Sequence, residues 1–320
     1  MKRIKNANQL FLVVVLFYLA GSFLLRGVQL PVNLSLVMGE ILMAAPILFY
    51  CLAMRTNPLK GVPLRPLRIS VILLLIVFAF SMLPVVAIVN LISMLFSKNY
   101  VVDVVDRISG NPLALNLLLM AVVPCVVEEL AFRGVFYHTY RRRGLWIGAF
   151  VSGGIFGLMH MNFNQFSYAF LLGIVFAILV EATGSIFAPM VVHFMINANS
   201  VVLSWMTQKL GTAAAAAPSG GMDVWEVLLE GAGPGGFAIL AVVGGTLLMM
   251  ALGGAGICFA LLLAMSKLSK REAALAAFKP GRRREYPEEG RERERLLDGY
   301  LLAAVFVCVG YMVWLNIKIG

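Results

Sequence analysis

Long runs of hydrophobic residues dominate the chain, and polar residues gather in the short segments between these runs. A membrane-spanning helix requires about 20 apolar residues, and nine segments approach or exceed this length. Their ranges are 9–27, 33–54, 69–96, 113–140, 145–162, 167–183, 185–206, 236–266 and 299–317. The runs are continuous and lack the alternating pattern of a transmembrane β-barrel. The pattern therefore predicts an all-α polytopic integral membrane protein with about nine transmembrane helices.

Two polar segments and one short connection separate some of these hydrophobic runs. Residues 207–235 are rich in Ala, Gly and Pro, which indicates an external linker. Residues 267–298 combine ten cations with seven anions and are expected to form a solvated cytoplasmic loop, helical at first and broken at Pro280. Contact of this loop with anionic lipid is the alternative. Because the runs 167–183 and 185–206 nearly touch, we expect a tight helical hairpin around Gly184.

Composition excludes a soluble protein. Hydrophobic residues make up 61% of the 320 residues, charged residues only 13%, and the mean hydropathy is +0.90, whereas a soluble domain carries about 25% charged residues. The net charge of +10 would suggest nucleic acid for a soluble protein, but here basic loops on the cytoplasmic side explain it. With the N-terminus inside, twenty Lys and Arg residues fall in cytoplasmic segments and five outside. This distribution favours a cytoplasmic N-terminus, an uncleaved first helix and an external C-terminus.

Ionisable residues inside predicted spans are functional candidates, because each costs at least about 2.5–3.5 kcal/mol to insert. The candidates are Glu40, Glu128, Glu129, Arg133, His160, Glu181 and His193, together with the neutral Asn197. On a helix, Glu129 and Arg133 are four residues apart and can pair. Glu128 then points elsewhere and remains available for acid–base chemistry. Glu40 and Glu181 receive no role, and Glu181 is expected to be solvated near the inner interface.

Two further motifs place polar groups at a similar depth. His160 shares a helix face with Phe156, and His193 shares one with Asn197, so that the latter pair could donate hydrogen bonds to an oxyanion. Counted along the helices, these residues and Glu128 lie about 12–24 Å from the cytoplasmic end. Pro124 and Pro189 each precede a motif by four residues and can open the helix to water. The alternative is that these polar residues only join helices.

In this order and spacing, the motifs resemble those of the CPBP family, which comprises CAAX prenyl endopeptidases and the Abi proteins of bacteriocin processing and self-immunity. The motifs are Glu128-Glu129-x-x-x-Arg133, Phe156-x-x-x-His160 and His193-x-x-x-Asn197. The resemblance divides the chain into N-terminal helices (1–112), a CPBP-like catalytic core (113–206), the linker 207–235 and a C-terminal elaboration (236–320). It covers only the core.

The resemblance implies roles for individual residues. Glu128 would activate a water molecule with help from His160, while His193 and Asn197 would stabilise the tetrahedral oxyanion. Glu129 and Arg133 would support the site. The family is often described as metallopeptidases, and a zinc ion could use Glu128, His160 and His193 as ligands. The chain has no His-Glu-x-x-His motif, so we favour a metal-free mechanism without a cofactor.

The leading hypothesis is therefore an intramembrane endopeptidase of the CAAX-protease type, acting on a protein or peptide at the bilayer and not on nucleic acid. A non-catalytic immunity or scaffold protein that keeps the motif residues for packing is the alternative. A transporter that uses Glu40, Glu128 and Glu181 is a third, weakened by the lack of a repeated pair of broken helices. The family's breadth suggests a bacterial plasma membrane.

Overall fold

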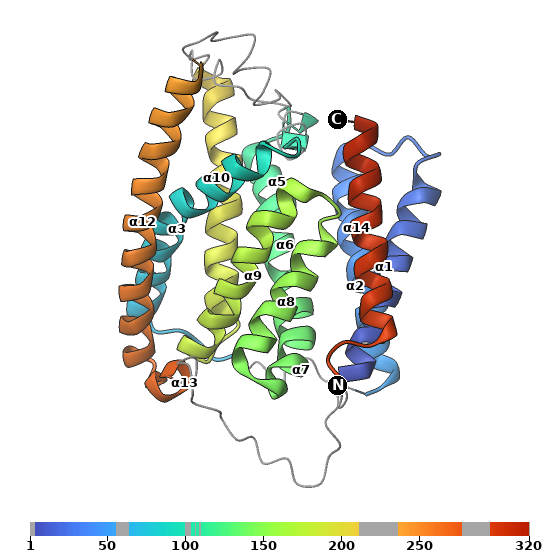
Figure 1. The fold of residues 1–320 in the computed structure, drawn as a ribbon, viewed down its shortest axis with the longest axis horizontal. Coiled ribbons are helices and arrows are strands. Elements are labelled where there is room, and N and C mark those ends of the chain that lie inside the picture. Colours follow the sequence, from blue (N-terminus) through green and yellow to red (C-terminus); the bar gives the residue numbers. More distant parts are fainter. Residues whose placement is uncertain are drawn as a thin grey trace.

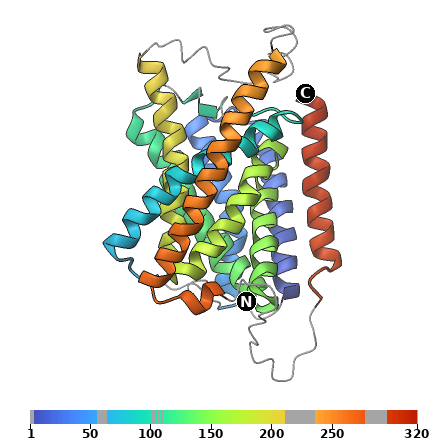
Figure 2. The ribbon, with the colours of Figure 1, turned by 60° about the vertical axis from the view of Figure 1, so that its left-hand side comes forward.

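A computed structural model of the chain describes residues 4–55, 64–99, 104–105, 107–108, 110–210, 236–276 and 295–319. These residues form helices and contain no β-strand, which confirms the predicted all-α class. Most long helices run side by side along one direction, and α3 crosses them obliquely (Figures 1 and 2). The long helices are α1 (Ile4–Leu25), α2 (Val32–Ala53), α3 (Ile69–Met94), α8 (Leu145–Met159), α9 (Phe163–Thr183), α10 (Phe187–Leu210), α12 (Gly236–Leu268) and α14 (Gly299–Ile319).

One further long helix is a composite that covers residues 113–143. It consists of α5 (Leu113–Leu117), the π-helical turn η2 (Leu118–Val122), α6 (Val123–Ala131), the π-helical turn η3 (Phe132–Tyr137), α7 (His138–Tyr140) and the 3-10 turn η4 (Arg141–Arg143). A π-helical turn inserts an extra residue into the helix and is often found at functional sites. Both π-helical turns flank α6, the segment that carries the two adjacent glutamates.

The nine predicted spans are all helical, but one is shorter than predicted. Eight helices of the described residues are long and apolar enough to cross a membrane, and α8 is not among them. With 15 residues, α8 is about 22 Å long, compared with about 30 Å for the hydrocarbon core. The helix stops because the chain turns sharply at Met161, which adopts a positive φ of 53°. The turn places His160 at the very end of the helix.

Small residues allow the helices around the site to pack closely. A Cβ atom added to Gly173 on α9 would lie 2.6 Å from Cα of Gly153 on α8, so the two backbones are in direct contact. The predicted hairpin between α9 and α10 is confirmed: α9 ends at Thr183, and Gly184 has a left-handed φ of 70°. The N-terminal and C-terminal helices surround this centre, with α14 packed on α1 and α12 on α3 (Figure 1).

Contacts between the predicted cytoplasmic segments place them at one end of the bundle. Arg68 donates a hydrogen bond to the carbonyl of Leu268, and Asn8 donates one to the carbonyl of Leu296. The N-terminus and α13 (Glu272–Ala276) lie at this end, and the C-terminus lies at the other (Figure 1). The grouping agrees with the predicted topology, whereas the assignment of this end to the cytoplasm stays a prediction.

The expectation that Glu181 is solvated was wrong. Its side chain is only 2% exposed, and its carboxylate pairs with Arg141 at 2.7 Å and with Arg271 at 3.3 Å. Tyr137 donates a third hydrogen bond to it at 3.2 Å. The segment that contains α13 folds back over the end of α9 and supplies Arg271. This residue is 90 positions from Glu181, so the local sequence pattern could not predict the contact.

Parts of the predicted linkers can be compared with the structure. The predicted external linker starts at residue 207, but α10 continues to Leu210, and residues 211–235 lie outside the described residues. Within the predicted cytoplasmic loop, α13 confirms a short helix, and the predicted break at Pro280 lies outside the described residues.

Candidate active site

The composite helix presents its three charged motif residues on two faces. Glu129 and Arg133 are both fully buried and form the predicted ion pair, with 2.9 Å between Oε1 and Nη1. Arg133 also donates a hydrogen bond to the carbonyl of Gly173 on α9 at 3.3 Å. Glu128 points away from this pair, and its side chain is 14% exposed. The adjacent glutamates therefore have different environments, as the helical spacing predicts.

Two phenylalanine rings enclose the buried guanidinium group. The carbon at the centre of the Arg133 guanidinium lies 4.5 Å from the ring centre of Phe156 and 4.8 Å from that of Phe176. Phe156 also makes edge contacts with the rings of His160 and His193. A cation against aromatic faces is stabilised electrostatically, most strongly where water is excluded. Phe156 thus joins the three motifs in one cluster, which explains its place in the second motif.

His193 on α10 lies between the two glutamates. Its Nδ1 is 3.0 Å from Oε1 of Glu129, a hydrogen bond in which the ring must be the donor if the carboxylate is ionised. Its Nε2 is 3.6 Å from Oε2 of Glu128, which is a close approach but longer than a hydrogen bond. Because Nδ1 already carries a proton, Nε2 can also donate only when the ring holds both protons. The site therefore contains a second potential cation besides Arg133.

His160 has one ring nitrogen fixed and the other free. Its Nδ1 is 2.9 Å from the backbone carbonyl of Phe156, which can only accept a hydrogen bond. The geometry therefore assigns the proton to Nδ1 and leaves a lone pair on Nε2 in the neutral ring. The next helix starts immediately afterwards, where Asn162 caps α9 by accepting a hydrogen bond from the backbone N–H of Gln165 at 3.1 Å. The capped turn holds the ring in position.

Asn197 contacts the composite helix at the point where its hydrogen bonding is interrupted. Pro124 has no N–H, so the carbonyl of Met120, four residues earlier, lacks its α-helical partner. The side-chain amide of Asn197 donates a hydrogen bond to this carbonyl at 3.1 Å. One N–H of the amide is thereby used, and the second remains available. The proline predicted to open the helix creates the acceptor that holds Asn197.

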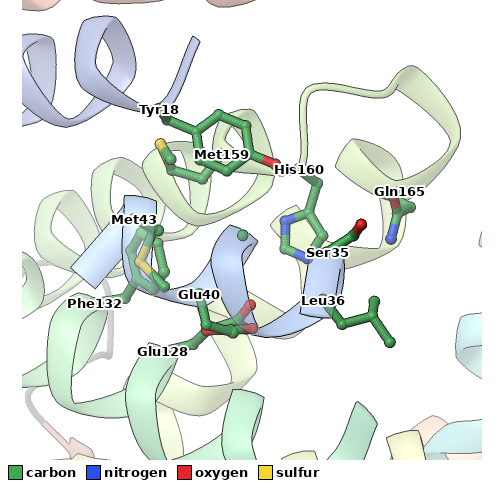
Figure 3. A pocket seen from close by; sticks show the side chains of 11 residues that line it. Tyr18, Ser35, Leu36, Glu40, Met43, Glu128, Phe132, Met159, His160 and Gln165 are labelled. Carbon is green, nitrogen blue, oxygen red and sulfur yellow. The ribbon is translucent and has the colours of Figure 1, made fainter. Parts of the chain in front are cut away.

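A cavity of about 280 Å³ lies beside Glu128. Its lining residues come from the N-terminal helices, the composite helix, the end of α8 with the turn after it, and the start of α9, and Figure 3 shows their side chains. They are Tyr18, Ser35, Leu36, Gly39, Glu40, Met43, Glu128, Phe132, Met159, His160 and Gln165. Since a water molecule occupies about 30 Å³ of the liquid, the cavity has room for several. Glu128 and His160 therefore face the same water-sized space.

The donor atoms do not form a metal site in this arrangement. Among the described residues, no group of three or more His, Cys, Asp and Glu side chains is placed to hold a metal ion. Of the proposed zinc ligands, His193 bonds to Glu129 and His160 to a backbone carbonyl through Nδ1. These bonds leave Nε2 of each ring as the atom that could bind a metal. Only Glu128 and His160 line the cavity together. In this arrangement, Glu128, His160 and His193 are not grouped around one position as a three-ligand zinc centre requires.

Of the predicted site residues, Glu128, Glu129, Arg133, His160 and His193 come together in one cluster. Asn197 lies on the same helix as His193 but is occupied with the carbonyl of Met120. Glu40 had no assigned role in the predicted endopeptidase site, yet it lines the cavity with Glu128. The feature that could have identified Glu40 from the sequence is its ionisable side chain inside a predicted membrane span. Phe176, which contacts Arg133 and His193, carried no signal among the many apolar residues of its helix.

Comparison with known proteins supports the resemblance. Residues 110–199 match the family model described as Type II CAAX prenyl endopeptidase Rce1-like. The chain is also similar to a Bacillus subtilis (strain 168) protein named "Putative membrane peptidase YdiL", with 26% identity over 101 residues. This similarity covers 31% of the chain and 41% of the relative. No solved structure matches the chain significantly. The resemblance to the CPBP family is confirmed for the segment that carries the motifs.

Proposed function

From the similarity of residues 110–199 to CAAX prenyl endopeptidases, we propose that this chain is an intramembrane endopeptidase that hydrolyses a peptide bond with a water molecule activated by Glu128. The observation that carries the proposal is the cavity at membrane depth, which Glu128 and His160 line together. Hydrolysis needs a general base and a place for water, and the cavity supplies both.

In the first step, a water molecule in the cavity donates one hydrogen bond to Glu128 and another to Nε2 of His160. The lone pair on that nitrogen follows from the hydrogen bond of Nδ1 to the carbonyl of Phe156. As the water oxygen attacks the scissile carbonyl carbon, Glu128 takes up a proton. A positioned general base of this kind accelerates a reaction by about 10²–10⁴-fold.

In the second step, the carbonyl oxygen becomes an oxyanion and needs hydrogen-bond donors. His193 supplies Nε2 when its ring holds both protons, and Asn197 supplies the N–H that is not bound to Met120. The proton on Glu128 then passes to the leaving nitrogen as the C–N bond breaks. The products are a free carboxylate and a free amine, and Glu128 returns to its starting state.

Glu129 and Arg133 support this chemistry without contacting the substrate. Their buried ion pair fixes Nδ1 of His193 through the shared oxygen of Glu129, which sets the orientation of Nε2. The substrate is proposed to be a membrane-associated protein or peptide, and the setting a bacterial plasma membrane with the N-terminus in the cytoplasm.

Peptide cleavage by purified variants tests the proposal. Glu128→Gln and His160→Ala should each lose at least about 10²-fold in kcat while keeping the melting temperature of the wild type within a few degrees. Glu272→Gln, on the exposed surface of α13, serves as the matched control and should cleave normally. Retained cleavage in both site variants would reject the mechanism.

A metal dependence and a non-catalytic role each predict a different outcome. Metal analysis of the purified protein, with cleavage measured with and without a chelator, distinguishes a metallopeptidase from the proposed mechanism. If the chain is an immunity or scaffold protein instead, no peptide is cleaved, and Glu128→Gln leaves the protective phenotype intact while lowering thermal stability.

A further inference from the structure

Glu40 is a carboxylate of the cavity that the proposed mechanism leaves without a role. It lies on α2, eight residues after the start of that helix, and outside the segment 110–199 that matches the family model. An ionisable group at membrane depth is costly and is retained where it functions. Its position beside the proposed general base therefore calls for a physical explanation.

The carboxyl groups of Glu40 and Glu128 come from different helices and point toward each other across the cavity wall (Figure 3). The Oε2 atoms of both side chains are buried and lack a hydrogen-bond partner among the described residues. A buried oxygen without a partner is unfavourable, and here two residues that line the same cavity each carry such an oxygen.

The surroundings of Glu40 offer no cation to balance its charge. Tyr18 on α1 faces the same cavity, as do Glu128 on α6 and His160 after α8. Among the described residues, no Lys, Arg or His forms an ion pair with Glu40. Arg133 is bound to Glu129, and His193 lies beside Glu128 and Glu129. The potential cation His193 approaches Glu128 but forms no ion pair with Glu40. Two ionised carboxylates in low-dielectric surroundings repel each other strongly.

We propose that Glu40 is a positioning residue that shares one proton with Glu128, so that the resting pair carries a single negative charge. One O–H group between the two side chains gives both unpartnered oxygens a hydrogen bond. Two carboxylates that cannot ionise together titrate as a unit, one proton at a time. The inference rests on the proposed function, because it assigns Glu128 as the base that Glu40 orients.

The shared proton is not consumed in the reaction. The attacking water gives one proton to the ionised oxygen of Glu128 and forms the new C–O bond. That same proton leaves with the amine nitrogen when the C–N bond breaks. Glu40 keeps its proton throughout and holds Glu128 by hydrogen bonding. The pair is active with one proton in the resting state, and inactive when it holds two or none.

The pH profile of kcat/KM tests this proposal. The wild type should show a bell-shaped profile whose alkaline limb reports loss of the shared proton. Glu40→Gln retains an N–H donor but cannot ionise, so it should keep activity within a few-fold at the optimum and lose that limb. Glu40→Ala removes the donor and should lower kcat by about tenfold or more. An unchanged alkaline limb in Glu40→Gln, or a wild-type profile in Glu40→Ala, overturns the proposal.

Infrared spectroscopy provides a second measurement that does not depend on activity. At neutral pH, the wild type should show the C=O stretching band of a protonated carboxyl group, and Glu40→Gln should lack it. A wild type without the band, or an unchanged band in Glu40→Gln, contradicts the shared proton. Failure of the proposed function is distinguishable: in that case either the wild type cleaves no peptide or Glu128→Gln still cleaves it, and the infrared band still tests the shared proton. If Glu128→Gln is inactive while the Glu40 variants match the wild type, only the shared proton is disproved.

Discussion

Oε1 of Glu129 lies 3.0 Å from Nδ1 of His193, and the same oxygen accepts a hydrogen bond from Arg133 at 2.9 Å. One carboxylate oxygen thus joins the first motif to the third. All three side chains are less than a tenth exposed. The neighbouring carboxylate of Glu128 is left to face the cavity. Of the two adjacent glutamates, Glu129 holds Arg133 and His193 in place, and Glu128 is available for the proposed reaction.

This separation predicts opposite effects for the same substitution at the two glutamates. Glu129→Gln removes the charge that balances buried Arg133 and should lower the free energy of unfolding by about 3–5 kcal/mol. Glu128→Gln should change stability far less and abolish cleavage. Thermal unfolding and peptide cleavage, measured on both proteins in the same detergent, test the contrast. A larger loss of stability in Glu128→Gln would reverse the assignment.

The aromatic enclosure of Arg133 predicts that its shape matters as well as its charge. Arg133→Lys keeps a cation but loses the flat group between Phe156 and Phe176 and the hydrogen bond to Gly173. Lysine does not replace arginine at a stacked site, so the melting temperature should fall by several degrees. The exposed Arg107 gives the control, and Arg107→Lys should have no effect. Equal melting temperatures would show that charge alone suffices.

Because α8 and α9 are in backbone contact, adding a single methyl group at Gly173 should strongly reduce stability and cleavage. In Gly173→Ala, the new Cβ atom would lie 2.6 Å from Cα of Gly153, and rigid backbone must move. Gly154 is the residue after Gly153. In Gly154→Ala, the new Cβ atom would lie 4.0 Å from the ring of Phe170, which is an ordinary van der Waals contact. We expect Gly173→Ala to cost about 1–3 kcal/mol of stability and to reduce cleavage, because α8 carries His160. Gly154→Ala should resemble the wild type in both assays.

The hydrogen bond between Asn197 and the carbonyl of Met120 allows catalysis to be separated from packing. Asn197→Ala should lower kcat by about 10²–10³-fold if the amide binds the oxyanion, and it also leaves that carbonyl unpartnered. Pro124→Ala supplies the missing N–H to the same carbonyl. The double variant should therefore recover stability but not activity. Recovery of activity would show that Asn197 acts only through Met120.

Local spacing predicted the parts of the site that lie on one helix. The hydrophobic runs located the helices, and the four-residue spacing of Glu129 and Arg133 predicted their ion pair, because both depend on helix geometry alone. The partners of His193 and Glu181 come from other helices, and their distances depend on packing that the sequence does not reveal. For this reason Glu181 was wrongly expected to be solvated. Glu40 was noticed as ionisable, but its approach to Glu128 joins positions 88 residues apart.

The end of α8 was mispredicted for a different reason. Beyond Met159, the apolar Met161 and Phe163 alternate with the polar His160 and Asn162, and the predicted span extended to residue 162. The structure ends the helix at Met159, because Met161 adopts a positive φ and Asn162 starts the next helix. Hydropathy reports preference for lipid, and it does not detect a turn whose polar groups bond internally.

The shortness of α8 has a consequence for the lipid around it. The turn after this helix lies below the ends of α10 and α14 (Figure 1), and α8 is roughly 8 Å shorter than an unperturbed bilayer core. Lipids beside a short segment compress, and headgroups descend toward it. A peptide tethered to that leaflet would reach His160 without being pulled clear of its anchor.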